Sequence, residues 1–209
     1  MAAITGGRVT VLGVGSTSLQ GDAGFSRVLA QMGCEVVQDE HRTTVSAPKD
    51  GVLQAVDVDM GDITDTFMTA AVLMATCPKG SVSRITNIAN QRVKECNRIE
   101  AMVTELGKCG VVCEELVDGL AIHGQGRGLP GPLHHGPVNI HCYKDHRIAM
   151  SFGVLGCHWP NVVISDKDCT DKTYPAFWDD VCNLFVNPDA VRAVHDSEAE
   201  QYTSSLPPR

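Results

Sequence analysis

Apolar residues recur along this chain with two different periods, and segments of the two kinds alternate. Short segments in which apolar and polar residues take turns, as in residues 82–88, predict strands with one buried face. Longer segments with apolar residues three and four positions apart, such as Ile99, Met102 and Leu106 within 94–109, predict helices. The pattern predicts strands at 8–13, 34–37, 43–46, 82–88, 111–117, 120–123, 138–142 and 162–165, and helices at 21–32, 65–75, 94–109, 146–157 and 174–185. Strands that alternate with helices indicate an α/β protein.

The order of the predicted elements repeats. Residues 32–37 and residues 109–114 both run from the end of a helix through a glycine into a strand that begins a hairpin. A repeated unit with the order βαβαββ explains this order, and two unrelated joints between a helix and a hairpin explain it equally well. A third segment, residues 138–185, is predicted to contain strand, helix, strand and helix but lacks the closing hairpin of the repeated unit. We expect one domain over residues 1–187, followed by a polar, disordered tail at 188–209.

The composition is that of an ordinary globular domain, with 209 residues of which 43% are hydrophobic and 20% charged. The net charge of -8 argues against broad binding to nucleic acids or to anionic membranes, because both require a positive surface. No segment approaches the roughly 20 apolar residues that span a bilayer, and residues 1–7 lack the basic and apolar regions of a signal peptide. We therefore expect a cytoplasmic protein whose chain begins directly at a strand. A plastid location stays open if a transit peptide lies on a part of the protein outside this sequence.

Residue types that often bind metals or phosphates form no known motif here. The nine cysteines include no Cys-x-x-Cys pair, so they are interpreted as small core hydrophobes in a reducing compartment rather than as zinc ligands. His134 and His135 fall in a loop at 124–137, where solvated side chains are a simpler interpretation than a metal site. The chain lacks the Gly-x-x-x-x-Gly-Lys-Ser/Thr motif of P-loop ATPases, and the glycines at 124–128 precede no predicted helix.

Cationic residues stand at three predicted strand-to-helix joints. Lys94 and Arg98 are four apart, so on a helix they project from the same side, and the positive end of the helix dipole adds to their attraction for anions. His146 and Arg147 open the next helix, where the same dipole disfavours both cations, and such a local conflict is typical of functional sites. Lys172 stands at the third joint. Because such joints can meet on one face of a layered α/β domain, the pattern indicates a site for a ligand with several negative charges.

Two carboxylates near these cations have alternative interpretations. Glu95 lies three residues before Arg98, a spacing that also suits an ordinary surface ion pair. Asp65 begins a predicted helix, where its default role is that of an N-cap worth about 1 kcal/mol. A carboxylate at such a helix start also reaches a substrate hydroxyl and accepts its proton. The residues alone leave both alternatives open.

Four segments closely resemble the C-terminal half of the 5-enolpyruvylshikimate-3-phosphate (EPSP) synthase family. They read Ser-Leu-Gln-Gly-Asp at 18–22, Asp-Thr-Phe-Met-Thr at 65–69, Asn-Gln-Arg-Val-Lys-Glu-Cys-Asn-Arg at 90–98 and Lys-Thr-Tyr-Pro at 172–175. The resemblance extends from about Ala3 to Phe185, and residues 90–98 are similar to the form found in the pentafunctional AROM polypeptide of fungi and some protists. It implies one α/β domain of the enolpyruvyl transferase fold, built from βαβαββ units of which the last is incomplete in this chain.

The resemblance also implies a reaction of aromatic amino acid biosynthesis. The 5-hydroxyl of shikimate 3-phosphate adds to the central carbon of phosphoenolpyruvate, phosphate is then eliminated, and neither a metal nor an organic cofactor is required. Residues that match the family's motifs receive roles through this resemblance. Asp65 contacts the shikimate hydroxyls and acts as base, Glu95 moves a proton at the enolpyruvyl carbon with His146 beside the site as a further catalytic residue, Asn90 and Lys94 hold shikimate 3-phosphate, and Arg98, Arg147 and Lys172 hold phosphoenolpyruvate.

The chain departs from the family in two ways. Lys144 replaces the acidic or amide residue that often precedes Asp-His-Arg, which reverses a charge close to the expected site. The family's active site lies between two domains, and the N-terminal half with its own lysine, arginines and Ser-Ser-Gln phosphate clamp is outside this sequence. We therefore expect the chain to need that complementary half-domain as a partner. The alternatives are a non-catalytic half-domain that binds phosphorylated ligands or pairs with a partner, and a relative that acts on a UDP-sugar.

Overall fold

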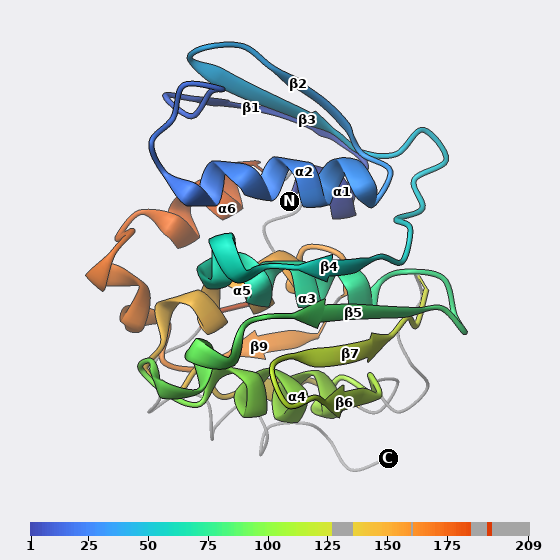
Figure 1. Ribbon diagram of the computed structural model, residues 1–209. Helices are drawn as coiled ribbons and strands as arrows, with labels where there is room; N and C mark the ends of the chain where they lie inside the picture. Colours follow the sequence, from blue (N-terminus) through green and yellow to red (C-terminus); the bar gives the residue numbers. More distant parts are fainter. Residues whose placement is uncertain (127–135, 160, 185–191, 194–209) are drawn as a thin grey trace.

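A computed structural model describes residues 1–126, 136–159, 161–184 and 192–193, and its strands and helices alternate as the sequence predicts (Figure 1). The described strands form three sheets, which confirms the α/β class. The strands are β1 (Arg8–Leu12), β2 (Glu35–Gln38), β3 (Arg42–Ser46), β4 (Asp57–Asp59), β5 (Val82–Thr86), β6 (Cys113–Glu115), β7 (Leu120–His123), β8 (Val138–Ile140), β9 (Val162–Ile164) and β10 (Arg192–Ala193). The α-helices are α1 (Ala2–Thr5), α2 (Phe25–Gln31), α3 (Phe67–Ala75), α4 (Arg98–Lys108), α5 (His146–Gly156) and α6 (Phe177–Leu184). The 3-10 helices are η1 (Gly21–Gly24), η2 (Gly61–Thr66), η3 (Ala89–Val93) and η5 (Lys167–Lys172).

The middle of the chain forms one complete βαβαββ unit, in the order β4, α3, β5, α4, β6 and β7. β4 and β5 pair in parallel, with Val58 opposite Ile85, and β7 pairs antiparallel with both β5 and β6. Gly119 closes the β6–β7 hairpin, and a Cβ at this position would lie 1.8 Å from the carbonyl oxygen of Ile85, so only glycine fits. The hairpin predicted across Asp118 and Gly119 is confirmed. The sequence pattern does not predict β4, because three residues are too few to show a period.

The first part of the chain repeats the second half of this unit. β1 pairs antiparallel with β3, and β3 pairs antiparallel with β2, so the order β1-β3-β2 matches β5-β7-β6. Helix α2 occupies the place that α4 has in the complete unit, and Figure 1 shows it lying below the three-stranded sheet at the top of the molecule. The repeat indicated by residues 32–37 and 109–114 is therefore a repeat of structure. The chain does not begin directly at a strand, because Ala2–Thr5 form the short helix α1, in which residues 2–4 are buried.

The last part of the chain repeats the first half of the unit. α5 connects β8 to β9, and these two strands pair in parallel, with Val138 opposite Val162. β10 pairs in parallel with β9. Arg192 and Ala193 of β10 are the described residues of the predicted tail at 188–209. The rest of that tail, and His134 and His135 with their predicted loop, lie outside the described residues.

Helix α3 forms the centre of the core. All of its residues except Thr69 are buried, because it is apolar on every side and therefore needs neighbours all around. It packs against α5, and the hydroxyl oxygens of Thr69 and Ser151 lie 3.1 Å apart where the two helices meet. This contact holds the joint that precedes α3 close to the joint that precedes α5.

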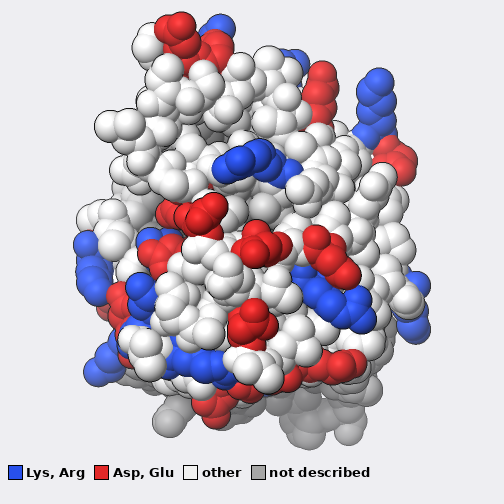
Figure 2. Space-filling model, in the orientation of Figure 1, with Lys and Arg blue, Asp and Glu red and all other residues white. Residues whose placement is uncertain are grey.

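The charged side chains on the face shown in Figure 2 are mixed rather than gathered by sign. Lysine and arginine residues lie beside aspartate and glutamate residues on this face. None of the helices in the described part of the chain combines the length and the apolar character that crossing a membrane requires.

Candidate active site

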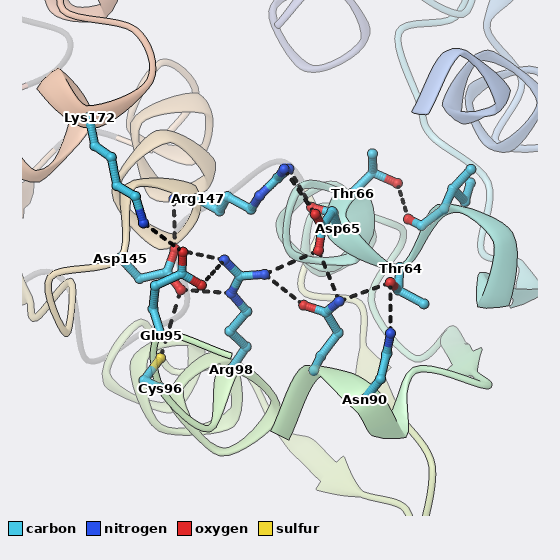
Figure 3. A network of polar contacts seen from close by, with 12 residues as sticks. Thr64, Asp65, Thr66, Asn90, Glu95, Cys96, Arg98, Asp145, Arg147 and Lys172 are labelled. Atoms are coloured by element: carbon cyan, nitrogen blue, oxygen red, sulfur yellow. Dashed lines mark hydrogen bonds and ion pairs between the residues drawn. The ribbon is translucent and has the colours of Figure 1, made fainter. Parts of the chain in front are cut away.

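The predicted site residues gather where four strands end. β4 leads into η2 with Asp65, β5 leads through η3 to Glu95 and Arg98, β8 leads to Arg147 in α5, and β9 leads through η5 to Lys172. Since β4 and β5 are parallel, and β8 and β9 are parallel, the carboxyl ends of each pair lie on one side, where ligands bind in open α/β sheets. Figure 3 shows these side chains pointing toward one another. The predicted convergence of cationic joints on one face is therefore observed.

Arg98 lies at the centre of this network, with a side chain that is only 2% exposed. Its Nε donates to Asp145 Oδ2 at 2.7 Å, and its Nη2 donates to Glu95 Oε2 at 2.8 Å. Its Nη1 donates to Asp65 Oδ1 at 3.2 Å and to the amide oxygen of Gln91 at 2.8 Å. The ion pair with Glu95 exists, but it is one part of a buried cluster and not an ordinary surface pair. The donors of Arg98 therefore contact groups of the protein itself.

Helix α4 begins at Arg98 and not at residue 94 as predicted. The Asn97 side chain accepts a hydrogen bond from the Glu100 backbone N–H at 3.4 Å and donates to the Glu100 carboxylate at 3.0 Å, so Asn97 caps the helix. Lys94 precedes this cap and is exposed, whereas Arg98 is buried. The expectation that Lys94 and Arg98 project from one side of a helix is therefore wrong.

Asp65 is not the N-cap of a helix. It lies inside η2, the N-cap position of α3 belongs to Thr66, and no side chain caps that helix. Its Oδ1 accepts hydrogen bonds from Gln91 Nε2 at 3.0 Å and from Arg98. Its Oδ2 pairs with Arg147 Nη2 at 3.0 Å, and Arg147 Nη1 donates to the Asp65 backbone carbonyl at 3.1 Å. The carboxylate of Asp65 is thus aimed into the cationic cluster.

Asp65 and Glu95 are both held in the charged form. Burial works to raise the pKa of Asp65, but the hydrogen bond from Gln91 and the neighbouring cationic charges outweigh it, so the pKa is lowered. A hydrogen bond from its own backbone N–H, followed by one from Lys172 Nζ at 3.1 Å, lowers the pKa of Glu95 to about 2. Both groups therefore carry a negative charge at neutral pH and can accept a proton.

The dipole at the start of α5 disfavours the cations predicted there, His146 and Arg147. Asp145 and the protonation state of His146 remove this conflict. The buried carboxylate of Asp145 caps α5, accepting from the Arg147 backbone N–H at 2.9 Å while it also holds Arg98. His146 is 7% exposed, and its Nδ1 has no hydrogen-bond partner among the described residues. Burial lowers the pKa of His146. Its imidazole is therefore neutral at neutral pH, and the start of the helix carries no second cation.

The two residues expected to hold shikimate 3-phosphate lie beside Asp65. Asn90 Nδ2 donates to Thr64 Oγ1 at 3.3 Å, next to Asp65 in the chain, and the charge of the exposed Lys94 is close enough to lower the pKa of Asp65. Lys144 is exposed and directly precedes Asp145, in a left-handed backbone conformation with a φ of 55°. The positive charge of Lys144, where an acidic or amide residue is usual, therefore lies next to the site.

Asp145 and Gln91 both contact Arg98, and neither is predicted as a site residue from the sequence. Asp145 carries a recognisable signal, since an aspartate directly before a predicted helix is a typical N-cap. Gln91 carries none, because its place depends on Thr64 and Asp65, and Asp65 is 26 residues earlier in the chain.

The described residues contain no group of three or more His, Cys, Asp or Glu residues placed to hold a metal ion. All nine cysteines are free thiols, and Cys34, Cys77, Cys109 and Cys142 are buried in agreement with their interpretation as core residues. Cys182 is exposed and does not fit that interpretation.

Known proteins resemble the chain in sequence and in structure. Its sequence is 50% identical over 193 residues to the pentafunctional AROM polypeptide of Mycosarcoma maydis, a match that covers 87% of this chain and 11% of that polypeptide. EPSP synthase from Acinetobacter baumannii aligns with a TM-score of 0.68 at 24% identity, covering 88% of this chain and 43% of that one. The enolpyruvyl transferase NikO from Streptomyces tendae aligns with a TM-score of 0.62 at 17% identity, covering 85% and 39%. The chain thus shares the fold of both structures and spans less than half the length of each relative.

The assignment of the chain to a family follows from a match over most of its length. Residues 1–181 match the family model for EPSP synthase (3-phosphoshikimate 1-carboxyvinyltransferase), and this range includes each of the joints that form the network. The chain therefore belongs to the EPSP synthase family of carboxyvinyl transferases.

Proposed function

We propose that this chain supplies one half of an EPSP synthase active site. This enzyme transfers the enolpyruvyl group of phosphoenolpyruvate to the 5-hydroxyl of shikimate 3-phosphate, a reaction of aromatic amino acid biosynthesis. The observation that carries the proposal is the convergence of Asp65, Glu95, Arg98, Arg147 and Lys172 from four joints. Both substrates carry a phosphate and a carboxylate, so a cluster of cations with two charged carboxylates complements them.

The cations of the site pair with carboxylates of the chain itself. Arg147 pairs with Asp65, and Lys172, whose side chain is 63% exposed, pairs with Glu95. The ion pair of the exposed Lys172 contributes about 1 kcal/mol or less, so a substrate phosphate or carboxylate can replace it at little cost. The internal carboxylates thus keep the cations ordered until substrate anions take their place.

This exchange changes the chemistry of Glu95. After its own backbone N–H, the hydrogen bond from Lys172 and the charges of Arg98 and Lys172 lower its pKa, so the transfer of these two cations to phosphoenolpyruvate raises it. Glu95 then takes up a proton and delivers it to C3 of phosphoenolpyruvate. In the same addition step the 5-hydroxyl oxygen bonds to C2, and the hydroxyl proton passes to Asp65.

The tetrahedral intermediate then loses phosphate. C3 returns a proton to Glu95, the electron pair left on C3 forms the new double bond to C2, and the bond from C2 to the phosphate oxygen breaks. In this scheme Arg147 and Lys172 stabilise the departing anion, while Asn90 and Lys94 hold shikimate 3-phosphate beside Asp65. The neutral imidazole of His146 is near enough to sense the charge of Glu95, and it is proposed as a further proton donor or acceptor.

The site is proposed to close against a complementary N-terminal half-domain. Lys94 and Lys172 are both exposed on the cationic cluster, and the chain covers only 43% of the Acinetobacter baumannii EPSP synthase. Shikimate 3-phosphate and phosphoenolpyruvate would bind between the two halves, where each half contributes part of the charge.

The test is phosphate release from phosphoenolpyruvate in the presence of shikimate 3-phosphate. We expect no release with this chain alone or with the separately made N-terminal half alone, and release when the two are mixed. Lys172→Met should remove activity from the mixture, whereas Lys49→Met, which changes an exposed lysine in a loop, should not. A mixture that forms a complex on a sizing column but releases no phosphate would refute the proposal in favour of a non-catalytic half-domain. Release with a UDP-sugar in place of shikimate 3-phosphate would favour the related transferase.

A further inference from the structure

Gln91 is an uncharged side chain enclosed by the charged groups of the site. It lies in η3 and is 0% exposed. Its amide nitrogen donates to Asp65 Oδ1 at 3.0 Å and to Thr64 Oγ1 at 2.9 Å, and its amide oxygen accepts from Arg98 Nη1 at 2.8 Å. The amide is therefore engaged through both its nitrogen and its oxygen.

These contacts fix which way the amide faces. A flipped amide would turn its NH2 group toward the guanidinium of Arg98 and its oxygen toward the carboxylate of Asp65, replacing two attractive contacts with two repulsive ones. Only glutamine among residues of this length supplies a donor on one side and an acceptor on the other. Glutamate lacks the donor, and methionine lacks both.

The contacts also make the two carboxylate oxygens of Asp65 unequal. Oδ1 is held by the buried pair Gln91 and Arg98, whose Nη1 contacts both the amide oxygen and Oδ1. Oδ2 is held by Arg147, whose side chain is partly exposed. When Arg147 turns to a substrate anion, Oδ2 becomes the oxygen with a vacant acceptor position.

We propose that Gln91 is a positioning residue for Asp65, holding Oδ1 toward the interior so that Oδ2 is the atom that accepts the substrate proton. This inference rests on the proposed function, in which Asp65 is the base. The hydrogen bond from Gln91 also helps to keep Asp65 charged, since it lowers the pKa of that carboxyl group.

The test compares Gln91→Glu with a matched change at Gln125. Gln125 is partly buried and donates to the His123 carbonyl at 3.1 Å. It follows β7, which is antiparallel to β5, so it lies at the opposite end of the sheet from the site. Gln125→Glu therefore adds the same charge away from Asp65.

The first measurement is a carbon-13 NMR titration of the Asp65 carboxyl group in this chain alone. We expect Gln91→Glu to raise the pKa of Asp65 by about one unit or more, as a like charge at hydrogen-bonding distance does, and Gln125→Glu to leave it unchanged. If Gln91→Glu does not fold, Gln91→Met gives the same test, because loss of the amide donor shifts the pKa in the same direction. An Asp65 titration that is identical in wild type and in the folded Gln91 variant overturns the inference.

The second measurement is the pH dependence of kcat/KM for the chain mixed with the complementary half. The acid limb should move to higher pH in the Gln91 variant by the same amount as the Asp65 pKa, a shift that loss of stability alone would not produce. An acid limb that stays in place would overturn the catalytic part of the inference. Absence of activity in the wild-type mixture would instead count against the proposed function, and the NMR titration would still decide whether Gln91 controls Asp65.

Discussion

Helix α4 carries two buried charges, Arg98 in its first turn and Glu105 further along, and their surroundings differ. Glu105 is completely buried, and its two oxygens accept from Lys108 Nζ at 2.8 and 2.7 Å. The hydroxyl of Tyr143 donates to it at 2.9 Å, and the backbone N–H of His141 at 3.1 Å. Each of these partners is a donor, so the single anion is satisfied and no anion competes with it.

Arg98 is surrounded by three carboxylates, more anions than one cation balances. Asp145 is fully buried, but Asp65 and Glu95 are partly exposed and are shared with Arg147 and Lys172. The contacts of Glu105 with Lys108, Tyr143 and His141 form a fixed joint between α4 and the turn before Asp145. Around Arg98, by contrast, the partly exposed carboxylates of Asp65 and Glu95 can exchange partners. The fixed joint supports the exchangeable one, because Glu105 ties α4 to the turn before Asp145.

That turn is held against its own backbone preference. Tyr143 and Lys144 both have a φ of 55°, a left-handed conformation that costs residues other than glycine about 1–2 kcal/mol. The hydrogen bond from Tyr143 to Glu105 is one contact that holds it. A strained turn directly before Asp145, His146 and Arg147 is the kind of feature that a rigid support has to stabilise.

The largest expected effect is on catalysis. Glu95→Gln should lower kcat of the reconstituted enzyme by roughly 10²- to 10⁴-fold, because glutamine neither accepts nor delivers a proton. Steady-state phosphate release measures the change, and Glu114→Gln, which alters an exposed carboxylate paired with His123, should have no effect. An unchanged kcat in Glu95→Gln would reduce this residue to an ion-pair partner of Arg98.

The next largest effect is on stability. Arg98→Met leaves the fully buried Asp145 without its cation, which should lower the free energy of unfolding by about 3–5 kcal/mol. Urea unfolding followed by circular dichroism gives this value. The double variant Arg98→Met with Asp145→Asn should recover a large part of the loss, since no buried charge is then left unpaired. A double variant no more stable than Arg98→Met would show that the charge of Asp145 is not the cause.

A smaller effect is expected at the fixed joint. Tyr143→Phe removes one of the hydrogen bonds to Glu105 and should lower the free energy of unfolding by about 1.5–3 kcal/mol, the usual range for a hydrogen bond to a charged group. Hydrogen exchange of the amides at 141–147 should become faster at the same time. Tyr174→Phe is the matched control, because the exposed Tyr174 donates to the Asp180 carboxylate in a hydrogen bond at the surface. Equal losses in the two variants would contradict the distinction between a buried joint and a surface contact.

The smallest effect is a change of stability with pH. The folded pKa of Glu95 is about 2, below the ordinary value of 4.5, so the unfolded chain binds more protons between these values. The stability that this group contributes is therefore present above pH 4.5 and is lost as the pH falls toward 2. Urea unfolding from pH 5 to pH 2 should show a shallower decline in Glu95→Gln than in wild type. Parallel curves would mean that Glu95 is not held by its cations in the folded state.

Local features of the fold are predictable from the sequence. The alternation in residues 82–88 and the Asp118-Gly119 turn predict β5 and the β6–β7 hairpin, because both depend on neighbouring residues. The start of α4 is less predictable, since Asn97 and Lys94 are both compatible with a helix terminus and only the cap contact with Glu100 decides between them. Helix α1 is missed because its stability comes from burial against the core rather than from its sequence.

The candidate site is predictable as a set of charges but not as a geometry. The cations at the joints stand out in the sequence, and the structure brings them together. The central position of Arg98, the burial of Gln91 and the true partners of Asp65 depend on contacts between segments far apart in the chain. For the same reason the sequence favours an N-cap at Asp65, whereas its actual partners are Gln91 and two arginines.

If substrate anions replace Glu95 as the partners of its cations, the pKa of Glu95 has to change when phosphoenolpyruvate binds. The carboxyl group of Glu95 is titrated by carbon-13 NMR in the reconstituted complex, without ligand and then with phosphoenolpyruvate but no shikimate 3-phosphate, so that no turnover occurs. We predict a pKa of about 2 without ligand and a clear rise when phosphoenolpyruvate binds, because Lys172 and Arg98 then serve the substrate while the hydrogen bond from the backbone N–H of Glu95 remains. A pKa that stays near 2 with phosphoenolpyruvate bound would contradict the exchange and leave Glu95 as a fixed partner of these cations.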